Sequence, residues 1–501
     1  MKRIIKSILF VTILGLASCK PANSTSAGST NSGGNNYVSI PPGAKYYQET
    51  NTKYTLRDAN EQIGWNTLNS TGNQKMLIVP VQLSGCTAWT NTMLDNLNKV
   101  FFGEASDTDW HSVSSYFETS SYGKLKITGE VTSVFRSSYT EKQVRNFGEA
   151  CSDYIASEFQ SSSQYSNDLK KAYDQDNDGY IDCTIFIYTN RYENSATTPF
   201  WAWCYYTDSY PNRNAPTVNN YMWASYYFME DGYSSSSAPS GLDAHTFIHE
   251  SGHLLGLDDY YCYDSSKPWD AAGDREMQSY NIGDHNIYSK LAMGWIDPLV
   301  PVGNCQIKLR SSALYGDAIL LKNNWNHSVF DEYILIEYYT PEGLNELDSR
   351  FSYDSRNRMY TQSGLRIYHV DARLVKLKEV NTVWGVTYVA NGYTSDFIDN
   401  TPCFVGASNS LEMAYIDDTQ IRYVHLIDSG NRNTLAAGSS GGNSIKINGN
   451  ETLWLEGSSF SATSAYFKNG NDKFNDGTNV GYSITVGAIS NGSITVNINT
   501  L

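Results

Sequence analysis

Apolar and polar positions in the first 300 residues follow two patterns, one with strand spacing and one with helix spacing. Dense or alternating apolar runs predict strands at 76–83, 125–135 and 183–188. Apolar residues three or four positions apart predict helices over 90–102, 110–122 and 141–160. Strands interspersed with helices indicate a layered domain, and we predict an α+β domain over residues 46–298.

The pattern changes after residue 300, where short alternating segments are separated by Gly, Asn, Asp and Ser. These segments lie at 305–310, 317–322, 333–339, 364–370, 421–427, 452–456, 480–487 and 492–499. A period of two predicts strands with one buried face. We therefore predict antiparallel, sandwich-like β structure, divided at 438–443 into a β-rich region 299–437 and a C-terminal β segment 438–501.

The N-terminus predicts export and a lipid anchor. Three basic residues precede an apolar run over 8–16, which is too short to span a bilayer. The sequence LASC at 16–19 resembles a bacterial lipobox, which implies removal of a signal peptide 1–18 and lipidation of Cys19. An ordinary signal peptide that ends near a cysteine is the alternative. Residues 19–45 are rich in Ser, Asn and Gly and predict a flexible tether.

Charge and cysteine content limit the classes of partner. The formal net charge is −16, and loss of the three basic residues in 1–18 leaves −19. Such acidity argues against nucleic-acid binding. Seven cysteines remain after Cys19, so at least one thiol is unpaired. An oxidising envelope permits one to three disulfides among them.

The stretch 249–259, HESGHLLGLDD, has the spacing of a zinc site. On a helix, His249 and His253 lie on one face, about 5–6 Å apart at Cβ, and can hold one zinc ion. Glu250 can reach a water on that metal. Gly256 can leave the helix with positive φ, so that the chain returns Asp259 as a third ligand. Three protein ligands and one open position are what a hydrolytic zinc site needs.

Two other interpretations of this stretch remain open. Phe247, Ile248, Leu254 and Leu255 would also suit an amphipathic core helix with two incidental histidines. Asp258 could replace Asp259 as the third ligand, although the spacing favours Asp259.

The extended motif resembles the metzincin clan of zinc endopeptidases, and with Asp as third ligand it is most similar to the immune-inhibitor-A family of secreted bacterial metallopeptidases. Segments 112–131, 364–371 and 480–486 are also similar to that family. The resemblance implies a metzincin-like zinc peptidase domain with Met277 in its Met-turn. Some metzincins carry a Tyr two residues after the Met, whereas Tyr280 follows Met277 by three, which favours core packing over transition-state stabilisation for Tyr280.

Residues 174–182, DQDNDGYID, predict a structural calcium loop. The candidate ligands are the carboxylates of Asp174, Asp176, Asp178 and Asp182 and the carbonyl of Tyr180. Gly179 permits the bend. Position 12 is Ile185 instead of Glu, so this is not a full EF-hand, and an acidic surface turn is the alternative.

For four further histidines the sequence predicts roles other than zinc binding. His245, one turn before His249, is predicted to lie at the surface or to line a cleft. His285 is predicted either to line the cleft near the zinc or to cap a helix. His369 and His425 lie in predicted strands and are expected to be structural.

Together these features predict a zinc-dependent endopeptidase, with Zn²⁺ as catalytic and Ca²⁺ as structural cofactor, in which Glu250 is the general base. We expect protein or peptide substrates and attachment to the bacterial cell envelope through the lipid. The alternative is a surface glycan- or protein-binding lipoprotein whose peptidase activity is secondary or lost. Tyr and Trp exposed together on the C-terminal β units would favour that alternative.

Overall fold

The structure is a computed structural model, which describes residues 38–40, 42, 56–61, 64–193, 198–263, 271–354, 356–382, 385–394, 403–410, 421–430, 449–461 and 472–501. The predicted signal peptide, the lipidation site Cys19 and the candidate boundary at 438–443 lie outside these residues. Of the helices in the described ranges, none has the length and apolar content needed to cross a bilayer.

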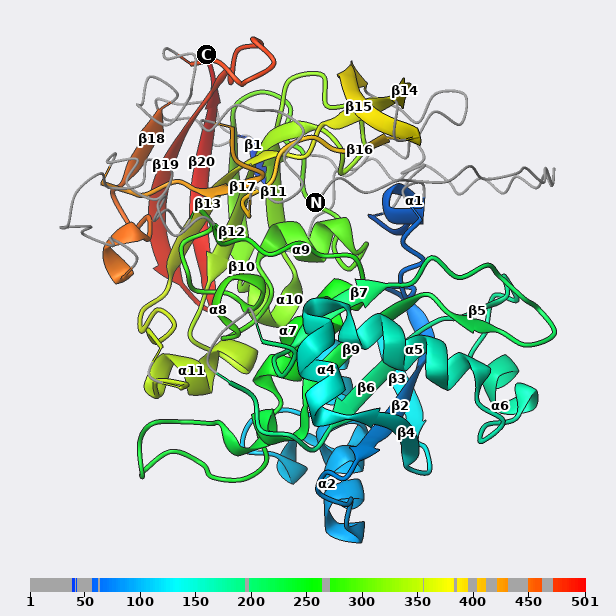
Figure 1. The fold of residues 1–501 in the computed structure, drawn as a ribbon. Coiled ribbons are helices and arrows are strands. Elements are labelled where there is room, and N and C mark those ends of the chain that lie inside the picture. The colour runs from blue at the N-terminus through cyan, green and yellow to red at the C-terminus, as the bar shows by residue number, and fades with distance from the viewer. Residues whose placement is uncertain are drawn as a thin grey trace, which may run out of the picture.

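A mixed sheet forms the centre of the N-terminal half (Figure 1). Its strands are β2 (Gly72–Ser84), β3 (Leu125–Val131), β4 (Phe135–Thr140), β6 (Thr184–Tyr188), β7 (Trp203–Tyr206) and β9 (Asn220–Ser225). The order is β3-β2-β6-β9-β7, and β4 also pairs with β2. Only β7 runs antiparallel to its neighbour. The α+β prediction did not anticipate this parallel pairing, which is closer to an α/β arrangement.

Helices cover both faces of this sheet because the strand side chains alternate between two cores. Met76 and Ile78 of β2 pack with one helix set, whereas Leu77 and Val79 pack with another. The first set is α2 (Asn91–Phe102), α3 (Val113–Ser120) and α7 (His245–Leu254), and the second is α4 (Glu141–Phe147) and α5 (Cys151–Ser161). The helix predicted over 141–160 is therefore two helices, separated at Gly148, where φ is 59°.

The C-terminal half contains two sheets packed face to face. One is antiparallel, with the order β11 (Ala318–Leu321), β12 (Glu332–Tyr339), β13 (Gly364–Asp371) and β17 (Val424–Leu426). The other has the order β1 (Val38–Ile40), β10 (Cys305–Arg310), β20 (Ser493–Thr500), β19 (Tyr482–Ser490) and β18 (Ser459–Ser461). Ile334 and Ile336 of the first sheet share a core with Val496 and Ile498 of the second.

Several predicted boundaries need correction. β1 lies inside the predicted tether 19–45 yet pairs with β10. Because β10 also pairs with β20, the regions 299–437 and 438–501 share one sheet. The segment 452–456 contains no strand, since Trp454 forms only an isolated bridge with Leu365. The outer face of β12 contributes Tyr333 and Leu335 to the core that contains α7, so a continuous core crosses the predicted boundary at residue 298.

The remaining helices are α1 (Leu56–Glu61), α6 (Asn167–Ala172), α8 (Met277–Tyr280), α9 (Ile287–Ala292), α10 (Ser312–Tyr315) and α11 (Glu346–Arg350). Two further sheets pair β5 (Tyr180–Ile181) with β8 (Thr217–Val218), and β14 (Leu374–Thr382) with both β15 (Gly385–Thr394) and β16 (Cys403–Val405). The thiols of Cys86, Cys151, Cys183, Cys204 and Cys305 are free, so these five form none of the disulfides that the sequence permits.

Candidate metal centre

The zinc motif lies on α7 and on the turn that ends it. Gly256 has φ of 101°, as predicted, and a Cβ at this position would lie 2.4 Å from Asn60 Nδ2. Asn60 Nδ2 donates to the Gly256 carbonyl at 3.3 Å. The backbone N–H of Leu257 donates to the Gly252 carbonyl at 3.0 Å, which closes the helix end. The chain therefore reverses and returns Asp259 to the helix.

The three predicted zinc ligands converge on one point. His249 Nε2 and His253 Nε2 are 3.2 Å apart, and Asp259 Oδ1 lies 3.0 Å from the first and 3.4 Å from the second. Two nitrogen or oxygen ligands at roughly 2.0–2.1 Å from a tetrahedral zinc are about 3.3 Å apart. The donor spacing thus fits one zinc ion. Asp258, the alternative third ligand, is not a member of this group.

Two backbone carbonyls orient the imidazoles. His249 Nδ1 lies 2.8 Å from the Met277 carbonyl, and His253 Nδ1 lies 2.7 Å from the Leu257 carbonyl. Because a carbonyl oxygen only accepts, each Nδ1 carries the proton, and each Nε2 presents a lone pair to the centre. Met277 is fully buried at the start of α8, which places the predicted Met-turn against the first ligand.

Three acceptor atoms that face one another require a positive charge between them. Burial alone would raise the pKa of Asp259, but His253 and His249 hold it well below its usual range. Burial lowers the pKa of His253, but Asp259 outweighs burial and raises it to about 10. Both shifts favour positive charge at the centre, which a divalent cation would supply.

Glu250 is buried beside the ligands without being one of them. The residue is 7% exposed, and Oε2 forms no hydrogen bond within the described structure. Burial raises the pKa of Glu250, against the opposing effect of His253 and His249. The Cys204 thiol donates to the Glu250 backbone carbonyl at 3.1 Å, which ties β7 to α7. A carboxylate with a free oxygen and a raised pKa suits a general base.

A tyrosine that the sequence-based prediction missed contacts the third ligand. The Tyr263 hydroxyl donates to Asp259 Oδ2, and the Tyr261 ring packs against that of Tyr263, with ring centroids 5.4 Å apart. Their position in DYYCY, directly after the ligand, was the available signal. Tyr280 packs against a second apolar cluster and against Tyr261, with ring centroids 6.2 Å apart, which fits the predicted packing role.

The other histidines lie elsewhere. His245 is fully buried, so the predicted surface or cleft-lining role is wrong. His285 is 1% exposed and bonds Gln278 Oε1 at 3.3 Å, whereas Asn286 caps α9, so His285 neither lines a cleft nor caps a helix. His369 and His425 face each other across β13 and β17.

The predicted calcium loop brings three of its carboxylates together. Ligand atoms of Asp174, Asp176 and Asp178 lie within 4.8 Å of one another, and Asp174 Oδ1 is buried without a hydrogen-bond partner. Burial raises the pKa of Asp178 to about 6, and the neighbouring Asp176 adds to the shift. Asp182 is outside this group and accepts the Gln175 backbone N–H at 3.0 Å. The carboxylates Asp174, Asp176 and Asp178 are therefore the better-supported part of this prediction.

Arg57 of α1 competes for the same carboxylates. Its Nη2 lies 2.5 Å from Asp176 Oδ2, which partly neutralises the loop without a metal ion. Gly179, with φ of 99°, holds the bend, since a Cβ there would lie 2.7 Å from the Asn212 backbone nitrogen.

Calcium is expected to raise the melting temperature of zinc-loaded protein. Binding to the folded state at 100 times the dissociation constant contributes about 2.7 kcal/mol to the free energy of unfolding. Calorimetry with calcium titrated at constant zinc measures this, and Asp178→Asn should remove most of the response. A wild-type melting temperature that is unchanged at millimolar calcium would support the alternative of an acidic turn.

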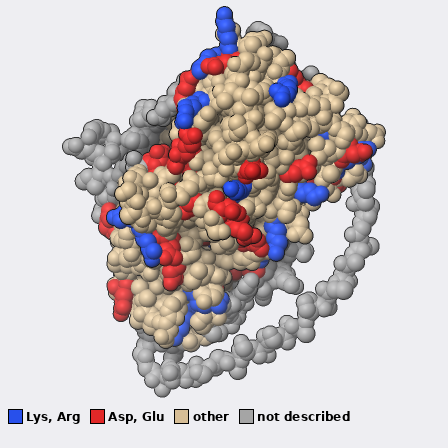
Figure 2. All heavy atoms as spheres, turned by 90° about the horizontal axis from the view of Figure 1, so that it is seen from below, with Lys and Arg blue, Asp and Glu red and all other residues tan. Residues whose placement is uncertain are grey.

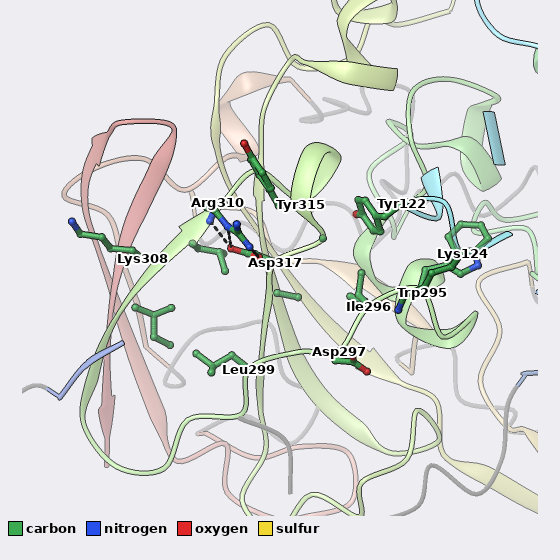
Figure 3. A pocket seen from close by; sticks show the side chains of 14 residues that line it. Tyr122, Lys124, Trp295, Ile296, Asp297, Leu299, Lys308, Arg310, Tyr315 and Asp317 are labelled. Carbon is green, nitrogen blue, oxygen red and sulfur yellow. Dashed lines mark hydrogen bonds and ion pairs between the residues drawn. The ribbon is translucent and has the colours of Figure 1, made fainter. Parts of the chain in front are cut away.

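One pocket, of about 180 Å³, lies between the two halves of the chain and away from these sites (Figure 3). Tyr122 and Trp295 line one side, and Arg310 and Tyr315 line the other. Arg310 is held by Asp317 through two bonds of 2.8 and 2.9 Å. None of the predicted site residues lines this pocket, so we assign no chemistry to it.

Acidic and basic side chains are interspersed on the face that Figure 2 shows. That face therefore has no field of a single sign that would steer a charged polymer.

Neither a family model nor a curated protein matches the sequence of this chain. Its function has to be inferred from the side chains that the structure brings together.

Proposed function

We propose that this chain is a zinc-dependent endopeptidase that hydrolyses extracellular proteins and is anchored to the bacterial cell envelope as a lipoprotein. The observation that supports it most is the convergence of His249 Nε2, His253 Nε2 and Asp259 Oδ1 beside a buried, unpartnered oxygen of Glu250. The resemblance of HESGHLLGLDD to immune-inhibitor-A-like metallopeptidases agrees with this proposal.

His249, His253 and Asp259 would hold the zinc ion, which supplies Lewis acidity for the attack of water on a peptide carbonyl. The Met277 and Leu257 carbonyls keep both imidazoles in the tautomer that leaves Nε2 available. Glu250 takes a proton from the attacking water through its unpartnered oxygen and passes it to the leaving amine nitrogen. Burial favours this exchange because it raises the carboxyl pKa towards neutrality.

The position of β7 supports a polypeptide as substrate. β7 is an edge strand, with β9 as its only strand partner in the described part of the chain. Its Cys204 contacts the carbonyl of Glu250, so this edge lies beside the metal ligands. An exposed sheet edge can bind an extended peptide through backbone hydrogen bonds. A peptide bound in this way would pass close to Glu250.

The exposed aromatic side chains of the C-terminal half give little support to the alternative binding function. Tyr315 and Tyr393 are 55% and 43% exposed, but no Trp is among the strongly exposed apolar residues of the described chain. The Tyr and Trp platform that would favour glycan binding is therefore not seen in the described residues.

The test uses the mature chain, purified without its signal peptide, and denatured casein as substrate. We expect cleavage that stops when 1,10-phenanthroline removes zinc and returns on addition of zinc but not of calcium. Casein cleavage that survives complete zinc removal, or zinc-loaded protein that cleaves neither casein nor gelatin, would refute the proposal.

A further inference from the structure

A second buried group of metal-binding side chains lies one helical turn before the zinc motif. Ligand atoms of Asp109, Asp243 and His245 lie within 4.8 Å of one another. Asp109 comes from the segment before α3, Asp243 directly precedes α7, and His245 begins it. Asp348 of α11 also approaches, with Oδ1 3.5 Å from His245 Nε2. Three segments of the chain therefore meet at this point.

The imidazole of His245 is held in a fixed orientation. It is stacked between Trp110, at 4.2 Å between ring centroids, and Tyr353, at 4.0 Å. Its Nδ1 lies 2.6 Å from Asp243 Oδ1, and Asp243 Oδ2 accepts the Tyr353 hydroxyl at 2.8 Å. A carboxylate bound to one imidazole nitrogen is the usual means of orienting the other nitrogen towards a metal.

Two atoms of this group lack a hydrogen-bond partner. They are Oδ1 of Asp109, a residue that is 6% exposed, and Nε2 of His245, a residue that is 0% exposed. Unpaired buried polar atoms are rare and destabilise a fold, so each needs an explanation such as an ion or water. Asp109 Oδ1 thus has no polar partner among the described residues, and the contact of His245 Nε2 is the ion pair with Asp348 Oδ1 at 3.5 Å.

The charges of the group do not balance without a cation. Asp109, Asp243 and Asp348 are all buried. Among the described residues His245 is the only basic side chain within ion-pair distance of Asp243 and Asp348, and Asp109 has no ion pair at all. Burial raises the pKa of Asp109 to about 7, and Asp243 adds to the shift. The metal-free group therefore resists a third negative charge.

We propose that a divalent transition-metal ion binds between Asp109 and His245, flanked by the carboxylates of Asp243 and Asp348, as a second site separate from the catalytic one. An imidazole with carboxylates suits zinc or manganese, whereas calcium prefers oxygen ligands alone. The ion displaces a proton from the imidazole, because Asp243 and Asp348 outweigh burial and raise the His245 pKa to about 10 in its absence. Its role is to fix the start of α7 against α11 and the segment before α3.

The test counts zinc bound to the mature chain after dialysis against excess zinc, with calcium present to occupy the acidic loop. Mass spectrometry of the metal should give two zinc ions for the wild type, one for a His249→Ala, His253→Ala double variant and one for Asp109→Asn. Asp371→Asn is the matched control, since Asp371 is also buried but is paired with Arg373 at 2.7 Å. This control should retain both ions.

Zinc should also raise the melting temperature of the double variant, and adding Asp109→Asn should remove that rise. If Asp109→Asn does not fold, the zinc count of the double variant decides alone. One ion in the wild type and none in the double variant would overturn the second site and leave the catalytic one intact. A double variant that loses no zinc while Asp109→Asn loses one would instead count against the proposed catalytic site.

Discussion

Replacing Glu250 by Gln is expected to lower kcat for peptide hydrolysis by about 10²- to 10⁴-fold, the usual contribution of a general base. The amide has the same size but cannot take a proton from water. Because Glu250 is not one of the three converging ligands, zinc should stay bound. Hydrolysis of a quenched fluorescent peptide measures kcat, and mass spectrometry of the metal measures the zinc content.

The matched control is Glu158→Gln on α5, a carboxylate that accepts bonds from Ser137 and Ser138 on the far side of the sheet. We expect this variant to keep its kcat. A Glu250→Gln variant that binds zinc and hydrolyses peptide at the wild-type rate would exclude Glu250 as the base. Another residue would then have to move the proton.

The sequence predicts the metal ligands because their geometry is local. His249 and His253 share a helix face through their spacing, and Gly256 reverses the chain within a few residues. The groups that orient them come from tertiary packing, which no local pattern encodes. The Met277 carbonyl reaches His249 only because α8 packs on α7, where Gly252 allows close approach to Gln278.

Errors in the sequence analysis occur where long-range contacts decide burial. The spacing of His245 gives no indication that Trp110 and Tyr353 enclose it from two distant segments. Strands with clear local alternation, such as β10 and β13, were predicted, whereas β7, β9, β14 and β15 were not. Parallel pairing in the central sheet depends on crossovers that periodicity does not reveal. The polar composition of residues 19–45 likewise gave no indication of β1, whose partner β10 begins at Cys305.

Replacing Asp259 by Asn is expected to weaken zinc binding by at least about 100-fold, or about 2.7 kcal/mol. Asp259 Oδ1 is an anionic oxygen that lies beside both Nε2 atoms, at 3.0 and 3.4 Å. An amide oxygen keeps the shape but loses the negative charge that favours the cation. Competition with a chromophoric chelator measures the dissociation constant without any need for peptidase activity.

Asp258→Asn is the matched control, because the sequence allowed either aspartate as ligand and the structure groups only Asp259 with the histidines. We expect Asp258→Asn to bind zinc as tightly as the wild type. Tyr263→Phe removes only a hydrogen bond to Asp259 Oδ2. We therefore expect it to weaken zinc binding by about 10-fold, more than Asp258→Asn and less than Asp259→Asn. Equal zinc affinity in Asp259→Asn and the wild type would mean that two histidines hold the metal without a returning carboxylate. A larger loss of zinc affinity in Asp258→Asn than in Asp259→Asn would assign the ligand role to Asp258. The two variants can be compared directly because each removes one negative charge and the two positions are adjacent.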